Sequence, residues 1–328
     1  QAVHQPSGSR YGTVTNVDGR YSIQGMRTGG PYRVEISYIG YQTVIYKDIT
    51  LQLGEVYNLN VEMSESSELL NEVIVTAAKT KFTAEKTGAT TNISSAQITQ
   101  LPTVNRSISD IARLSPYANG MSFAGGDGRS TNFTIDGANF NNNFGLSSNL
   151  PGGGNPISMD AIEEVQVVVA PFDVRQTNFI GGGINAITKS GTNTFRGTAY
   201  TYYRNQDMRG NRINGEDLGA RSDESKTTYG FTLGGPIIKN KLFYFVSAEG
   251  KKNSYPSSTY PGYTSNYITS ATAKQIADQY KNLTGIEEAY GERDIEQKSF
   301  GLLARVDWNI SEKHKLAVRY QHNNSYKD

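Results

Sequence analysis

The chain has 328 residues, a length that allows two or three domains. Its 32 lysines and arginines balance 31 aspartates and glutamates, so bulk charge gives no reason to expect nucleic acid as a partner. The absence of cysteine excludes disulfides, zinc–cysteine sites and thiol nucleophiles. No apolar run reaches the ~18 residues that a membrane helix needs, but a β-barrel would escape this test because its apolar and polar residues alternate.

Short strands are predicted from Arg10 to Met63. The sequence "YGTVTNVDGRYSIQGM" places Asp18-Gly19, a strong hairpin signal, between two alternating runs. "PYRVEISYIGYQTVIY" alternates apolar and polar residues, and "GEVYNLNVEM" does so less strictly. Together these elements predict a small β-sandwich of about 55 residues.

Residues 1–63 resemble the carboxypeptidase regulatory-like (transthyretin-like) domain that precedes many outer-membrane receptors of Bacteroidetes. The resemblance lies in "PSGSRYGTVTNVDGRYSI" and "VEISYIGYQT". The family domain opens with an earlier strand, so the chain is expected to begin inside the domain. No catalysis is implied, because this is the non-catalytic domain of carboxypeptidases and His4 alone cannot supply the ligands of a zinc peptidase.

A polar, acidic linker is predicted at residues 64–81, "SESSELLNEVIVTAAKTK". Within it "EVIVTA" is β-prone, and by composition alone an ordinary short strand is as good an interpretation as a functional segment. A strand here has no evident partner in its own domain. The segment resembles the TonB box of TonB-dependent receptors, which implies that TonB binds Glu72, Val73, Ile74, Val75, Thr76 and Ala77.

Residues 82–190 are predicted to form an α+β domain. Ser94 and Gln97 have the spacing of a capping box, as do Ser107 and Asp110, so two short helices are expected. The apolar residues expected on one face of the second helix are Ile108, Ile111 and Leu114. Two strands, "TNFTIDG" and "IEEVQVVVA", are joined by a loop rich in asparagine and glycine, and "GGGINAITKSG" follows.

This segment is similar to the plug domain of TonB-dependent receptors. "GRSTNFTIDG" matches an Arg-Gly…Asp-Gly element of that family through Arg129, Asp136 and Gly137. "IEEVQVVVAPFDVRQTNFIGGGINAITKSG" matches a second signature, and its departures at Ala170-Pro171 and Asn178-Phe179 resemble the Oar-like branch. With the flanking segments, the resemblance covers nearly all of the chain.

The loop between the two plug strands is predicted to face a ligand, because asparagine and aromatic side chains can hydrogen-bond to and stack on a polar molecule. The residues concerned are Phe140, Asn141, Asn142, Asn143 and Phe144. A loop that only packs against the barrel wall is an equally good alternative.

Two other patterns in the plug segment are weaker. Gly181, Gly183 and Ala186 fit a dinucleotide fingerprint, but β-prone residues follow where that motif needs a helix. Asp127 and Asp136, with nearby asparagines, suggest calcium, but the ligand spacing of an EF-hand is not met and solvated loop residues are the better interpretation. No catalytic, cofactor or metal residue is predicted.

Residues 191–328 are predicted to form the first strands of a transmembrane antiparallel β-barrel. "TYGFTLGG", "SFGLLARVDWN" and "KLAVRYQ" alternate apolar and polar residues, although a soluble sandwich would show the same pattern. Alternating short and long connections favour the barrel, with Gln206–Ser225 and Gly250–Gln297 as cell-surface loops. The residues expected to face the lumen or the plug are Arg305, Asp307 and Arg319.

Within the second long loop, "ATAKQIADQYKNLTG" predicts a short helix that ends at Gly285. Five strands cannot close a barrel, and an unpaired backbone group in lipid costs several kcal/mol. The sequence is therefore expected to belong to a longer chain that supplies most of the barrel wall.

The resemblance implies a mostly β protein of the outer membrane, with its N-terminal domain and TonB box in the periplasm. It would import an unidentified ligand (a siderophore, peptide, protein or glycan) with energy from TonB and its inner-membrane complex, and its other partner would be outer-membrane lipid. The first alternative is an adhesin or matrix-associated barrel without transport. A secreted enzyme is the second, but the sequence offers no acid–base pair, nucleophile–base pair or metal cluster to support it.

Overall fold

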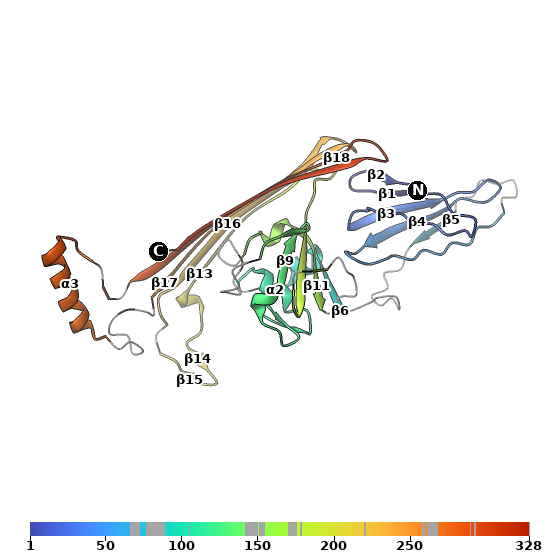
Figure 1. Ribbon diagram of the computed structural model, residues 1–328. Helices are drawn as coiled ribbons and strands as arrows, with labels where there is room; N and C mark the ends of the chain where they lie inside the picture. Colours follow the sequence, from blue (N-terminus) through green and yellow to red (C-terminus); the bar gives the residue numbers. More distant parts are fainter. Residues whose placement is uncertain are drawn as a thin grey trace. The chain divides into compact units, whose positions relative to one another are not determined.

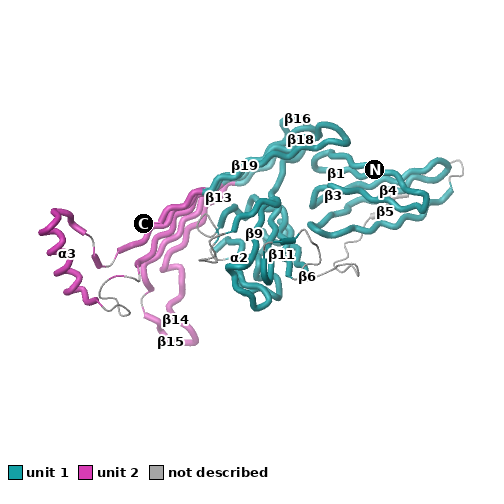
Figure 2. Tube along the Cα trace, in the orientation of Figure 1, with its two compact units in different colours: residues 1–198, 231–248, 301–323 teal, residues 199–230, 249–300, 324–328 magenta. Residues whose placement is uncertain are grey.

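The structure is a computed structural model that describes residues 1–65, 73–76, 89–103, 105–141, 150, 155–169, 176–177, 179–219, 221–257, 260, 268–288, 290–291 and 293–327. The chain divides into two compact units: residues 1–198, 231–248 and 301–323, and residues 199–230, 249–300 and 324–328 (Figure 2). Among the residues described, no helix combines the length and the apolar character needed to cross a membrane.

The N-terminal domain is built on a five-stranded sheet in the order β2-β1-β3-β4-β5 (Figure 1). The strands are β1 (Ala2–His4), β2 (Ser9–Tyr11), β3 (Gly29–Ile36), β4 (Val44–Leu51) and β5 (Val73–Thr76). Strands β1 to β4 pair antiparallel, whereas β5 runs parallel to β4. Strands β3 and β4 confirm the strands predicted in "PYRVEISYIGYQTVIY".

The second layer of this domain consists of two segments outside any strand, so the strands predicted around Asp18-Gly19 and in "GEVYNLNVEM" are wrong. Ile23, Met26 and Leu59 of these segments pack against the buried core of the sheet. Tyr21 Oη joins the two segments by donating to the Leu59 carbonyl at 2.7 Å. A cavity of about 840 Å³ remains between the segments and the sheet, so this layer is loosely packed.

The turn predicted at Asp18-Gly19 does form, with Gly19 at a φ of 75°. Asn16 Oδ1 accepts hydrogen bonds from the backbone N–H groups of Asp18 and Arg20, at 3.1 and 2.8 Å. The residues before the turn do not pair because their apolar side chains find no core; Val14, for example, is 87% exposed. Local turn chemistry is therefore satisfied without a hairpin.

His4 is buried at the end of β1. Its Nδ1 atom lies 2.7 Å from Ser7 Oγ, and its ring contacts that of Tyr32 with the centroids 4.9 Å apart. Burial, and to a smaller degree the Arg27 guanidinium, lowers the pKa of His4 from 6.5 to about 4. The folded domain thus keeps this imidazole neutral at pH values where the unfolded chain protonates it.

We therefore expect the N-terminal domain to lose stability as the pH falls from 6.5 to about 4. Above this window His4 does not reduce the free energy of unfolding. Below it, protonation of His4 lowers this free energy by about 3 kcal/mol, at roughly 1.4 kcal/mol per unit of pKa difference. This loss of stability is measured by hydrogen exchange of peptides that cover β1 and β3, corrected for intrinsic exchange rates. His4→Gln, which carries no charge at any pH, should flatten the dependence; an unchanged dependence would assign it to another group.

The plug is a second five-stranded sheet, in the order β10-β9-β12-β11-β6 (Figure 1). Its strands are β6 (Ala89–Ser94), β9 (Asn132–Ile135), β10 (Ala138–Asn139), β11 (Ile162–Val169) and β12 (Gly182–Thr188). A separate hairpin joins β7 (Ala118–Asn119) and β8 (Ser122–Phe123). Strand β12 pairs antiparallel with β11 and parallel with β9, which confirms the two predicted strands and adds a third.

Both helices predicted for the plug begin at their capping pairs. They are α1 (Ser95–Gln100) and α2 (Ile108–Ala112), accompanied by the 3-10 turns η1 (Gly128–Ser130) and η2 (Met159–Ala161). The Ser94 N–H donates to Gln97 Oε1 at 3.0 Å, and the Ser107 N–H donates to Asp110 Oδ2 at 3.3 Å. These bonds satisfy N–H groups that the helix itself leaves free.

Isoleucine and valine side chains fill the plug core. Ile108 and Ile111 are fully buried, but Leu114 is 40% exposed because α2 ends before it, so its predicted place on the same face is wrong. At Gly182 a Cβ atom would lie 2.6 Å from the ring of Phe123. Glycine at this position lets β12 pack directly against an aromatic ring of the core.

The third sheet has five strands in the order β13-β16-β17-β18-β19 (Figure 1). They are β13 (Arg196–Asn205), β16 (Ser225–Ile238), β17 (Leu242–Pro256), β18 (Asp294–Asn309) and β19 (Lys315–Lys327). Sequential strands are neighbours, as expected for the start of an up-and-down barrel. Among the described strands the sheet is open, with β13 and β19 at its edges.

Two long connections lie at one end of these strands. The first contains η3 (Gln206–Met208) and the hairpin of β14 (Arg212–Ile213) and β15 (Glu216–Asp217). The second contains α3 (Ser270–Thr284), which ends as predicted at Gly285 with a φ of 74°. The predicted bounds of this second loop, Gly250–Gln297, are wrong, since β17 continues to Pro256 and β18 begins at Asp294. The loop is shorter than predicted because the strands continue beyond their last apolar residues.

The two faces of the barrel strands differ as predicted. In β18, Leu303, Arg305 and Asp307 are buried, while the alternate residues Val306 and Trp308 are exposed. Strand β17 likewise buries Phe243, Phe245, Ser247 and Glu249 on one face. Buried charge on one face and exposed apolar side chains on the other are typical of a barrel wall between plug and lipid.

Candidate functional site

The segment predicted to bind TonB is partly described, as β5. Its backbone pairs in parallel with β4, in a register that sets Val73, Ile74 and Val75 opposite Val44, Ile45 and Tyr46. The expectation that this segment has no partner in its own domain is therefore wrong. Glu72 and Ala77 lie outside the described residues.

Strand β5 is the last strand of its sheet, so only one of its two edges is paired among the described strands. Pairing of this kind uses main-chain groups and depends little on side chains. The segment thus shows in this structure the property that a TonB handle needs, which is the ability to join a sheet as an added strand. Binding of TonB to this segment stays a prediction.

A group of charges, buried except for Arg319, joins the plug to strands β18 and β19. The plug contributes Asp136, which follows β9 directly and whose side chain is 4% exposed. Asp136 Oδ2 lies 2.9 Å from Arg319 Nε, and Asp136 Oδ1 lies 3.9 Å from Arg305 Nη1. Asp136 also accepts hydrogen bonds from the N–H and the hydroxyl of Thr188 at the end of β12.

Arg305 completes this group from the barrel side. Its Nε and Nη2 donate to the two oxygens of Asp307 at 2.8 and 3.0 Å, and its Nη1 donates to the Thr188 carbonyl at 2.7 Å. Arg27 of the N-terminal domain reaches the same cluster, with Nη2 3.2 Å from Asp307 Oδ1 and Nη1 3.2 Å from Ser190 Oγ. We name Asp136, Thr188, Arg305, Asp307 and Arg319 the plug–wall cluster.

The plug–wall cluster confirms that Arg305, Asp307 and Arg319 face the plug. A buried charge is tolerated only when it is paired and its remaining hydrogen-bonding groups are satisfied, which this geometry provides. The sequence marked Asp136 through its Asp-Gly element but gave it no role. The participation of Arg27 and Thr188 carried no sequence signal, because both contact residues of β18 that are more than a hundred positions away.

The other marked plug residues lie apart from this cluster. Arg129 forms an exposed ion pair with Asp127, whose pKa is lowered mainly by the hydrogen bond from the Arg129 side chain. The glycine-rich run leads into strand β12, whereas a dinucleotide fingerprint needs a helix at this place. Asp127 pairs with Arg129, whereas Asp136 pairs with Arg319.

Two residues of the predicted ligand loop are described, and both interact with the plug itself. Phe140 packs against the plug core. Asn141 Oδ1 accepts from the Phe133 N–H at 2.5 Å, and Asn141 Nδ2 donates to Asn132 Oδ1 at 2.7 Å. Asn142, Asn143 and Phe144 lie outside the described residues, so the ligand-facing role of the loop stays a prediction, and Asn141 already has a structural role.

Comparison with known families gives two matches. Residues 1–64 match the carboxypeptidase regulatory-like domain, and residues 187–282 match an outer membrane beta barrel domain. The first match covers strands β1 to β4 of the N-terminal sheet and the two segments that cover it. The second covers the end of β12 and the barrel strands as far as α3, and it places the protein in the outer membrane.

The chain is also similar to curated and solved proteins. It is 26% identical over 254 residues to the TonB-dependent transporter Oar of Myxococcus xanthus, covering 71% of this chain and 23% of that protein. Its fold resembles that of the outer membrane transporter YddB from Escherichia coli, with a TM-score of 0.52, 17% identity, and coverage of 73% of this chain and 33% of that one. The chain therefore spans about a quarter of the Oar relative and a third of YddB. The chain thus contains a carboxypeptidase regulatory-like domain and part of an outer membrane beta barrel domain, and it is similar in sequence to a TonB-dependent transporter and in fold to an outer membrane transporter.

Proposed function

We propose that this protein imports a ligand across the outer membrane with energy transmitted by TonB. The observation that carries the proposal is the plug–wall cluster, in which paired and buried charges fasten the plug to the barrel strands. A barrel whose plug is fastened in this way cannot act as a simple pore, because ligand passage requires separating paired charges, and a charge left buried without its partner is strongly unfavourable. An external source of energy is therefore part of the mechanism.

The proposed handle for that energy is the segment Glu72–Ala77. Among the described residues, the first plug element after this segment is β6, which begins at Ala89 and is an edge strand of the plug sheet. An edge strand has only one paired neighbour, here β11, so it can be detached without breaking the centre of the sheet. The proposed division is residues 1–63, 64–81, 82–190 and 191–328 as regulatory-like domain, linker, plug and barrel, with β5 of the linker paired to the sheet of the first domain.

Import can be tested with a deletion strain grown on single sources of iron, peptide and glycan. We expect one nutrient class to require both this protein and TonB for uptake. Surface binding that is complete without TonB, with no uptake dependent on it for any nutrient, would instead support the adhesin alternative. No enzymatic activity is part of the proposal.

We expect the two long connections to lie at the cell surface. An epitope tag inserted at Ala271, in the first turn of α3, should be labelled on intact cells, because long connections of outer-membrane barrels face outward. A tag at Lys239–Asn240, in the tight turn between β16 and β17, should be labelled only after permeabilisation. The reverse pattern would invert the assigned orientation.

A further inference from the structure

The outward face of two neighbouring barrel strands changes from apolar to cationic at a lysine. On β18 the outward residues are Trp308, Val306, Ala304, Leu302 and Phe300, followed by Lys298. On β17 they are Leu242, Tyr244, Val246, Ala248 and Gly250, followed by Lys252. The apolar run thus ends at a lysine on both strands.

The length of the run indicates what surrounds the lysines. Trp308 to Phe300 rises about 26 Å, at roughly 3.3 Å for each of the intervening steps. Tilted by about 40°, as barrel strands are, this run spans roughly 20 Å, close to the apolar band of outer-membrane barrels. Lys298 is the next outward residue, so it lies where hydrocarbon gives way to lipid headgroups.

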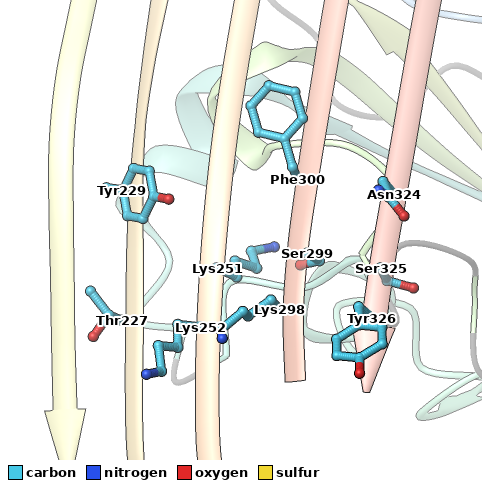
Figure 3. A pocket seen from close by; sticks show the side chains of 10 residues that line it. All are labelled: Thr227, Tyr229, Lys251, Lys252, Lys298, Ser299, Phe300, Asn324, Ser325 and Tyr326. Carbon is cyan, nitrogen blue, oxygen red and sulfur yellow. The ribbon is translucent and has the colours of Figure 1, made fainter. Parts of the chain in front are cut away.

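A pocket of about 420 Å³ lies at this level of the sheet. Figure 3 shows its side chains arranged across β16, β17, β18 and β19. They are Thr227, Tyr229, Lys251, Lys252, Lys298, Ser299, Phe300, Asn324, Ser325 and Tyr326. The lining therefore combines ammonium groups with aromatic rings, hydroxyls and an amide.

One carboxylate holds the two outward lysines together. Lys252 Nζ lies 2.6 Å from Glu296 Oε1, and Lys298 Nζ lies 2.7 Å from Glu296 Oε2. Two ammonium groups share one carboxylate, so the trio keeps an excess positive charge, and both lysine side chains are about half exposed. An anion that approaches the pair meets two positioned donors at once.

The aromatic part of the pocket depends on a glycine. The Tyr229 ring lies over Gly250, where a Cβ atom would come within 2.6 Å of it. Glycine beside an aromatic ring of the neighbouring strand leaves a flat apolar surface directly below the lysines. Such a surface suits an acyl chain or a sugar ring beneath a charged group.

We propose that this pocket binds a phosphorylated glycolipid of the leaflet that surrounds it, with the phosphate at Lys252 and Lys298. The pocket extends over four adjacent strands, a width of about 14 Å at roughly 4.8 Å between strands. A single glycerophospholipid headgroup is smaller than this, whereas a phosphorylated sugar headgroup fills it. Thr227 and Asn324 can then bind sugar hydroxyls, and Tyr229 and Phe300 face the lipid below.

Native mass spectrometry of the full-length protein, extracted in detergent and incubated with defined lipids, tests the proposal. We expect the unchanged protein to retain phosphorylated lipid A. The Lys252→Gln/Lys298→Gln protein should retain at least about tenfold less of this lipid, since each lysine near a lipid surface contributes about 1 kcal/mol to binding. The matched control is Lys239→Gln/Lys241→Gln, which removes two lysines at the opposite end of the β16–β17 hairpin and should bind normally.

The unchanged protein should bind lipid A without phosphates as weakly as the Lys252→Gln/Lys298→Gln protein binds phosphorylated lipid A. Equal retention of stripped and intact lipid A would overturn the phosphate assignment. Equal competition by phosphatidylglycerol would overturn the choice of a glycolipid, and competition by inorganic phosphate alone would overturn a lipid site. Gly250→Val, which displaces the Tyr229 ring but leaves both lysines, should weaken retention too.

Discussion

Ile74→Pro is expected to reduce uptake to the level of a strain without TonB, whereas Ile74→Ala retains most of it. Proline removes a backbone donor and blocks ladder pairing, while alanine leaves the main chain able to pair. If TonB binds Glu72–Ala77 by strand addition, only the backbone change matters. Uptake is measured with the nutrient whose use requires this protein, and surface binding of that nutrient should survive in both variants.

A proline placed outside the segment controls for a general effect on the linker. Ser66→Pro, six residues before Glu72, should leave uptake unchanged. Because β5 also pairs with β4, Ile74→Pro detaches it from the regulatory-like domain as well. Normal transport by Ile74→Pro would make the segment an ordinary strand of its own domain and would leave the receptor without its coupling mechanism.

Asp136→Ala is expected to loosen the plug, at a cost of about 3–5 kcal/mol, because it removes one partner of a buried charge group. Arg319 then loses its contact at 2.9 Å, and two donors of Thr188 lose their acceptor. Hydrogen exchange in β9 and β12 should rise, and the protein in planar bilayers should conduct ions more often than the unchanged receptor.

Asp127→Ala is the matched control for this change. Asp127 also pairs with an arginine of the plug, but both side chains are about half exposed, and exposed pairs contribute little. If Asp136→Ala behaves like Asp127→Ala in exchange and conductance, the plug–wall cluster does not fasten the plug, and the main structural support for energy-driven import is lost.

Local signals in the sequence predicted the elements that depend on local chemistry. The pairs Ser94/Gln97 and Ser107/Asp110 marked both helix starts, and Gly285 marked the end of α3. The two-residue alternation of the barrel strands also placed Arg305 on the plug side, because lipid on one face of a strand forces charge to the other. These predictions required no knowledge of which segments meet.

The remaining features depend on contacts between distant segments. The run around Asp18-Gly19 contains a good turn, but whether its flanks pair depends on the core available to Val14 and similar residues. The pairing of β5 with β4 joins residues about 30 positions apart, and β-prone composition alone cannot choose between that partner and TonB. Asn141 was expected to contact a ligand, yet its side-chain oxygen accepts a hydrogen bond from the backbone of β9. An asparagine side chain can form either interaction, so the residue type does not distinguish them.

If TonB binds Glu72–Ala77, the pairing of β5 with β4 gives the regulatory-like domain a part in energy coupling. TonB would then either add to the free edge of β5 or take the segment away from β4. In both cases residue 74 comes within reach of TonB, which makes this position the most informative for a test of the central claim.

That claim, a TonB-dependent receptor coupled through Glu72–Ala77, is tested most directly by cysteine cross-linking in cells. The chain has no cysteine, so Ile74→Cys introduces its only thiol. Paired with single cysteines in the C-terminal domain of TonB, it should form a disulfide-linked complex whose yield rises when ligand is added. Asn58→Cys, in an exposed segment of the regulatory-like domain, is the control and should give little product. Equal yields from positions 74 and 58, or no product from 74 with ligand present, would contradict the account.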